Sequence, residues 1–206
     1  MIPVIPFKRR RRQRTVAAVL GAVLSASLAA APRAADTPAA AAPGGAAGGA
    51  CLASGDGYLR AQLAGAIDAK IDWPNSGTHC EGEPRSKPPG VRLSFQRSPA
   101  GAVDLLFIFG LTGVHEGRPA REIGVNLTLI VQGTDRFFGT LGDSRCTVDS
   151  LTQRRLPKTR SYRVEARGFC TQPAHAVRGD GAVLVSTFEF AGLVNYDAAQ
   201  QAGTSQ

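Results

Sequence analysis

The chain holds three histidines, and each could act as an acid or base or bind a metal. His79 stands in the most polar cluster, where Cys80, Glu81 and Glu83 follow it. Such a cluster offers metal ligands or a general acid and base. The surrounding segment is rich in Gly, Pro and Ser, which favours a solvated loop held in place by Cys80. We therefore predict no metal site and no catalytic residue in this segment.

The other two histidines lack the neighbours that known catalytic motifs require. His115 precedes Glu116, but an HExxH zinc motif needs a second histidine where this chain has Pro119. His175 is isolated in the sequence, and the GDS triplet at 142–144 is not part of a GxSxG motif. A Ser-His-Asp site assembled from distant positions stays open as an alternative. The sequence predicts no catalytic residue, no metal and no cofactor.

The four cysteines favour disulfide bonds over metal or redox chemistry. No two of them have CxxC spacing, so neither a thioredoxin-like site nor a zinc site is supported. Cys146 follows one strand-like segment and Cys170 ends another, so we predict a Cys146–Cys170 bridge. Cys51 and Cys80 then form the second pair. Closing a loop of about 25 residues contributes roughly 3 to 4 kcal/mol through the entropy of the unfolded chain.

A locally basic region is the strongest surface candidate. Arg163, Glu165 and Arg167 alternate with Tyr162 and Val164, so they share the solvent face of a strand. A cationic face attracts anionic partners such as lipid headgroups, an acidic glycan or an acidic protein. The alternative is a solvated strand on which Glu165 neutralises its neighbours. The residues predicted to form this surface are Arg145, Arg154, Arg155, Arg160, Arg163 and Arg167.

The first 35 residues have the composition of a secretory signal peptide. A cationic start between Lys8 and Arg14 precedes an uncharged run over Val16–Ala31, which ends in small residues. This run of about 16 residues is shorter than the roughly 20 apolar residues of a spanning helix. We therefore predict a cleaved signal over residues 1–35 and export to the periplasm or the exterior. An uncleaved membrane tether is the alternative.

The charge of the chain belongs mostly to this leader. The formal charge is +8, from 24 Lys and Arg against 16 Asp and Glu. Seven of the basic residues lie before Asp36 and no acidic residue does, so removal of residues 1–35 leaves 17 basic and 16 acidic residues. A nucleic-acid-binding domain needs a basic excess to neutralise phosphates. The sequence therefore predicts no nucleic-acid partner.

The rest of the chain divides into a linker, one domain and a tail. Residues 36–50 are almost entirely Ala, Gly and Pro and predict a flexible linker. Residues 51–197 are enough for one globular domain, and residues 198–206 predict a disordered tail. Within the domain, apolar residues over Tyr58–Ile71 recur at spacings of three and four, which predicts a helix.

After this predicted helix the hydrophobic period changes to two, which is typical of strands. Gly192 interrupts the last of these segments, where we expect a bulge. No helical pattern separates the segments, so antiparallel pairing is favoured. The predicted fold is mainly β, or α+β by strict count: an antiparallel β-sandwich or curled sheet with one N-terminal helix packed on it. The strand segments are Val91–Gln96, Val103–Phe109, Asn126–Gln132, Phe137–Leu141, Tyr162–Arg167 and Leu184–Tyr196.

These features predict an exported, disulfide-stabilised and non-catalytic domain that binds an unknown protein, glycan or lipid headgroup in the cell envelope. One alternative is an envelope hydrolase that uses His79 or His175 with a nearby carboxylate. Another is a membrane-tethered structural protein, if the signal is not cleaved.

Overall fold

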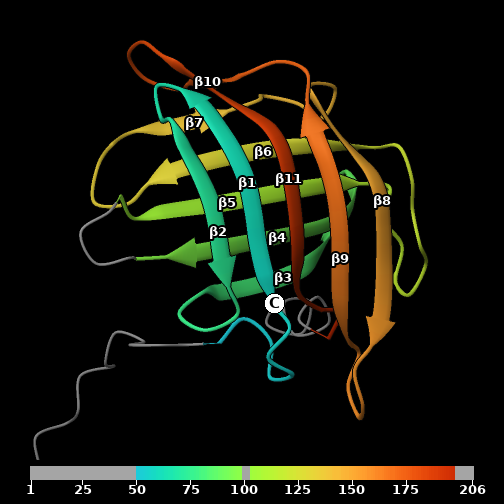
Figure 1. Ribbon diagram of the computed structural model, residues 1–206. Coiled ribbons are helices and arrows are strands. Elements are labelled where there is room, and N and C mark those ends of the chain that lie inside the picture. Colours follow the sequence, from blue (N-terminus) through green and yellow to red (C-terminus); the bar gives the residue numbers. More distant parts are fainter. Residues whose placement is uncertain (1–49, 99–102, 198–206) are drawn as a thin grey trace, which may run out of the picture. The chain divides into compact units, whose positions relative to one another are not determined.

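The computed structural model describes residues 50–98 and 103–197 (Figure 1). The predicted signal peptide and tail, and all but the last residue of the predicted linker, lie outside the described residues. Within the described ranges, no helix is long and apolar enough to cross a membrane.

In the described residues, eleven strands form one continuous sheet, and all of them pair antiparallel. The prediction of a mainly β, antiparallel fold is confirmed. The strands are β1 (Tyr58–Gly65), β2 (Ala69–Pro74), β3 (His79–Ser86), β4 (Pro89–Arg97), β5 (Leu105–Thr112), β6 (Ile123–Val131), β7 (Phe137–Gly139), β8 (Cys146–Arg155), β9 (Ser161–Cys170), β10 (Ala174–Ala176) and β11 (Ala182–Asn195).

The sheet folds over into two layers whose strands cross (Figure 1). The front layer has the order β2-β1-β11-β9-β8, and the back layer has the order β3-β4-β5-β6-β7. Hydrogen bonds join the layers at two places, through β6 with β8 and through β10, which pairs with both β7 and β11. The strands β2 and β3 are the two ends of the sheet.

The helix predicted over Tyr58–Ile71 is wrong, because these residues form β1 and the first half of β2. Leu59 and Leu63 are fully buried, and buried and exposed residues alternate along β1 between them. This alternation is the period of two of a strand. The chain turns after Gly65, whose φ is +109°, and returns in β2, where Ile71 lies opposite Ala61 and also faces the core. The apparent helical spacing comes from two strands read across a turn. Pairing with β2 and β11 decides the structure.

The core lies between the two layers and is built from aromatic side chains. Phe95 and Phe109 come from the back layer, and Phe188 and Phe190 from the front layer. The ring centroids of Phe109 and Phe190 are 4.9 Å apart, and those of Phe95 and Phe190 are 5.2 Å apart. Such tilted contacts add to the free energy gained by burying the rings.

Gly192 lets the two layers approach closely. The bulge expected there is absent, because Gly192 pairs regularly with Val164 of β9. A Cβ atom at Gly192 would lie 2.7 Å from Cζ of Phe95 in the opposite layer. The irregular pairings occur elsewhere, between Gln62 and Leu63 and after Val148. The glycine is therefore needed for packing and does not interrupt the strand.

Two disulfide bonds hold this sheet, with the pairing that the sequence predicts. Cys146 and Cys170 lie directly opposite each other on β8 and β9. Cys51 and Cys80 join the segment before β1 to the edge strand β3. The second bond thus ties the entry to the front layer to the edge of the back layer.

Candidate partner-binding surface

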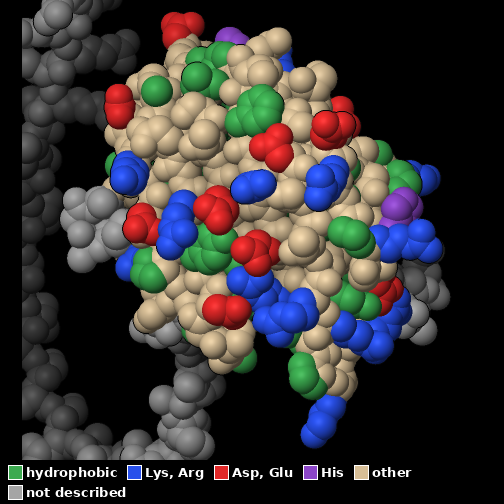
Figure 2. Space-filling model, turned by 45° about the vertical axis from the view of Figure 1, so that its right-hand side comes forward, with side chains coloured by type: hydrophobic (Ala, Val, Ile, Leu, Met, Phe, Trp, Pro, Cys, Tyr) green, Lys and Arg blue, Asp and Glu red, His purple; other side chains and the backbone are tan. Residues whose placement is uncertain are grey.

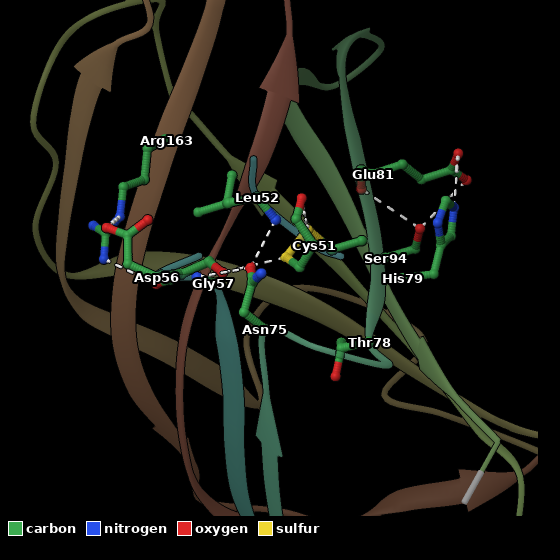
Figure 3. The surroundings of a disulfide bond; sticks show 12 residues. Cys51, Leu52, Asp56, Gly57, Asn75, Thr78, His79, Glu81, Ser94 and Arg163 are labelled. Carbon is green, nitrogen blue, oxygen red and sulfur yellow. Dashed lines mark hydrogen bonds and ion pairs between the residues drawn. A yellow bond between two sulfur atoms is a disulfide. The ribbon is translucent and has the colours of Figure 1, made fainter. Parts of the chain in front are cut away.

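The segment between Cys51 and β1 is fixed by Asn75 as well as by the disulfide (Figure 3). The side-chain oxygen of Asn75 accepts hydrogen bonds from the backbone N–H groups of Leu52 and Gly57, at 2.8 and 3.0 Å. The carbonyl of Asn75 accepts a third bond, from the N–H of Cys51, at 3.2 Å. These contacts hold the segment in one conformation and so position Asp56.

Asp56 is the first acidic partner of the predicted arginine surface. Its carboxylate lies 2.8 Å from Nε of Arg163 and 3.7 Å from a guanidinium nitrogen of Arg154. The hydroxyl of Ser54 donates a hydrogen bond to it at 2.5 Å. This hydrogen bond and the charge of Arg163 lower the pKa of Asp56. The carboxylate is thus held ionised between two strands that are distant from it in sequence.

Arg163 is enclosed by two carboxylates. Its side chain is only 13% exposed, and its second partner is Glu165, at 2.6 Å on the same strand. Because both neighbours already neutralise it, Arg163 contributes little free positive charge to the surface. For Arg163, this arrangement corresponds to the alternative in the sequence analysis, in which Glu165 neutralises its neighbours.

A tyrosine beside this group connects two glutamates. The hydroxyl of Tyr58 lies 2.8 Å from Oε1 of Glu189 and 3.3 Å from Oε1 of Glu165. Burial and the two carboxylates raise the pKa of Tyr58 well above its usual range. The phenol therefore stays protonated and donates to these carboxylates.

Arg160 is also neutralised within the domain. Its guanidinium pairs with the carboxylate of Glu116, and its backbone N–H donates to Asp197 at 3.3 Å. The hydrogen bond and charge of Arg160 lower the pKa of Glu116. The loop carrying Glu116 comes from between β5 and β6, so this ion pair fastens that loop to the start of β9.

The six predicted arginines do not form one patch. Arg145 lies at the opposite end of β8, where it donates to the carbonyl of Pro173 at 3.3 Å. Arg167 lies over the middle of the front layer, directly opposite Glu189 of β11. The other four come together where β8 and β9 join, and two of these four are neutralised by the carboxylates described above.

Four exposed cations remain at this junction, and we call them the cationic end: Arg118, Arg154, Arg155 and Lys158. Within the described ranges, only Arg154 of the four makes an ion pair, at 3.7 Å to Asp56. Basic side chains gather at the lower end of the domain in Figure 2. The cationic end is therefore smaller than the surface predicted from the sequence.

Arg118 could not be found from the sequence. It lies in the loop after β5, far along the chain from β8. The side-chain amide of Gln153 donates to the carbonyls of His115 and Arg118, at 2.7 and 2.8 Å. A backbone bridge between Ala120 and Leu151 fixes the same loop. These contacts place Arg118 beside the end of β8, and no local sequence pattern predicts them.

A shallow groove of mixed charge crosses the outer face of the front layer. Two adjoining hollows of about 610 and 320 Å³ share Arg167 and Glu189. Asp72, Arg60, Glu189 and Arg167 face one another in register across β2, β1, β11 and β9. Acidic and basic side chains are interspersed over this face (Figure 2). Because the charges alternate in sign, the groove has no strong preference for an anion or a cation.

The polar cluster at His79 lies on the edge strand β3. The solvated loop predicted from the sequence is therefore wrong. Nε2 of His79 is 3.9 Å from Glu81, and the hydroxyl of Ser94 is 3.4 Å from the same carboxylate (Figure 3). The carboxylate thus lies between the other two groups, whereas a Ser-His-Asp site needs the histidine in the middle. In the part of the chain that the structure describes, no three His, Cys, Asp or Glu residues are grouped to hold a metal ion.

Comparisons of the chain with protein-family models, with curated proteins and with solved structures found no match. The function has to be inferred from the geometry of the domain itself.

Proposed function

We propose that the protein is an exported, non-catalytic binding domain that recognises an anionic partner in the cell envelope through the cationic end. The partner is a protein, a glycan or a lipid headgroup with negative charge. The domain works in the periplasm or outside the cell, and its two disulfides are compatible with an oxidising environment of this kind.

The observation that carries the proposal is the unequal neutralisation of the basic residues. Glu116 and Asp56 neutralise Arg160 and Arg163 close to the sheet. Arg155 and Lys158 are exposed farther out, without such partners among the described residues. Cations that are exposed and unpaired keep their long-range attraction for an anionic partner, whereas neutralised ones do not.

The proposal is tested by the binding of poly-L-glutamate, a soluble polyanion, to the purified protein at low salt. The double variant Arg154→Glu/Arg155→Glu reverses half of the cationic end and should weaken binding by tenfold or more. The matched control Lys87→Glu/Arg178→Glu makes the same change in net charge at two exposed positions outside the cationic end. Equal weakening by both double variants would show that only net charge matters and would refute the proposed surface.

The histidines provide a second test, which separates binding from catalysis. Alanine at His79, His115 or His175 should leave polyanion binding within about twofold of the unmodified protein. If one of these substitutions abolished the activity of the protein in the envelope, the hydrolase alternative would replace the binding domain.

A further inference from the structure

We propose that the partner of the cationic end is the surface of a phospholipid bilayer that contains anionic lipids. This inference rests on the proposed function, because it assumes that the cationic end is the binding surface. It adds the identity of the partner and the way in which the domain approaches it.

The shape of the cationic end is the first argument. The hairpin between β8 and β9 projects beyond the rest of the domain (Figures 1 and 2). Its tip carries Leu156, which is half-buried, and Pro157, which is exposed, next to the cations. Residues 154–160 line neither of the two hollows of the front layer, nor a third hollow between Glu83 and Leu193. A projecting tip fits a flat surface, whereas a polymer chain is held by a groove.

The balance of charge is the second argument. Six basic residues at this end face four acidic ones, which leaves a net charge of +2. The basic residues are Arg118, Arg154, Arg155, Lys158, Arg160 and Arg163, and the acidic residues are Asp56, Glu116, Glu165 and Asp197. Glu116, Asp56 and Glu165 pair with Arg160 and Arg163 near the sheet, and Asp197 accepts from the backbone N–H of Arg160. The excess positive charge therefore lies toward the tip. Each Lys or Arg at an anionic membrane surface strengthens binding by about fivefold.

The tip of this hairpin is also held in one conformation. The N–H of Leu156 donates to the carbonyl of Ser161 at 2.8 Å, and Nε of Arg155 donates to the carbonyl of Thr159 at 3.0 Å. The N–H of Tyr196 donates to the carbonyl of Arg160 at 3.0 Å and fixes the base of the hairpin to β11. The cations are therefore presented together without first ordering a loop, which would weaken binding.

The test is co-sedimentation of the processed protein with lipid vesicles. We expect binding to vesicles of phosphatidylcholine with phosphatidylglycerol, and at least tenfold weaker binding to phosphatidylcholine alone. Because the attraction is electrostatic, it should decline strongly between low salt and 0.5 M salt. The variant Arg155→Glu/Lys158→Glu should bind the anionic vesicles at least tenfold less, while Lys87→Glu/Arg178→Glu should stay within about twofold. Unchanged fluorescence of Trp73 shows that each variant is folded.

The outcomes separate this inference from the proposed function. Binding to poly-L-glutamate without binding to anionic vesicles would refute the lipid surface and leave an acidic protein or glycan as the partner. Binding to neither would refute both proposals. Equal loss of vesicle binding in the tip variant and its control would also refute the assignment of the tip.

Discussion

The close approach of the two layers at Gly192 predicts that Gly192→Ala destabilises the domain. The new Cβ would lie 2.7 Å from Cζ and 3.2 Å from Cε1 of Phe95, and 3.3 Å from Cδ2 of Leu93. Carbon atoms in contact prefer about 3.5 to 4.0 Å. Phe95 is fully buried and packs against Phe109 and Phe190, so its ring cannot move away without disturbing the core.

The size of the effect follows from two opposing contributions. Overpacking of a core by one methyl group costs about 1 to 3 kcal/mol. Alanine also restricts the unfolded chain more than glycine does, which stabilises the folded state by about 0.4 to 1 kcal/mol. We therefore expect a net loss of about 1 to 2 kcal/mol in the free energy of unfolding. For a domain of this length, that corresponds to a fall in Tm of about 3 to 6 °C.

Urea unfolding under oxidising conditions measures this loss. Trp73 is the only tryptophan of the chain and is 6% exposed, so its fluorescence reports unfolding. Gly139→Ala is the control, because its Cβ would meet nothing closer than 3.7 Å. Adding Phe95→Leu to Gly192→Ala should restore part of the stability lost by the single glycine substitution, since the two sites touch. If Gly192→Ala unfolded at the same urea concentration as the unmodified protein, our account of the close approach would be refuted.

Three further predictions concern the contacts around this core. Asn75→Ala should lower the free energy of unfolding by about 2 kcal/mol, because two backbone N–H groups lose the one side-chain oxygen that accepts from both. Asn75→Asp should cost less, because it keeps an oxygen at this position. Similar stability in the two variants would contradict this role. Burial, followed by the charge of Glu116, raises the pKa of Tyr196 to about 12. The unfolded phenol ionises near pH 10, so the stability that this group contributes is complete below pH 10 and is lost as the pH rises toward 12, on the order of 2 kcal/mol. In urea titrations, Tyr196→Phe should reduce the fall in the free energy of unfolding between pH 10 and 12. An unchanged dependence on pH would contradict this role of Tyr196. Replacing Cys146 and Cys170 together by serine should cost roughly 3 to 4 kcal/mol from the entropy of the released loop, and a loss below 1 kcal/mol would show that the unfolded chain is already compact there.

Local patterns in the sequence were sufficient for the strand-rich class and for both disulfides. The alternation of buried and exposed residues around Tyr162 and Val164 is the same in β9 as in the sequence. The cysteine pairing follows from an even count without metal spacing and from two strand ends that meet. The strand class follows from the alternation of buried and exposed residues along each strand. The disulfides follow from the number and spacing of the cysteines. Both can be recognised in a local stretch of sequence.

The helix over Tyr58–Ile71 and the bulge at Gly192 fail for the same reason. Both patterns are local to one segment, whereas β1 takes its structure from pairing with β2 and β11. Gly192 is required by the ring of Phe95, which approaches from the other layer. A pattern within one segment contains no information about a neighbour that only folding brings to it.

Local sequence patterns are enough to establish a strand-rich domain with two disulfides and a surplus of arginines near β8 and β9. Which of these arginines are left without an acidic partner depends on the folded arrangement of distant segments. Asp56 reaches Arg163 across 107 residues, and Glu116 reaches Arg160 across 44. Ion pairs act through space over a few ångströms, so the charge that a surface presents is set by which distant carboxylates folding brings beside it.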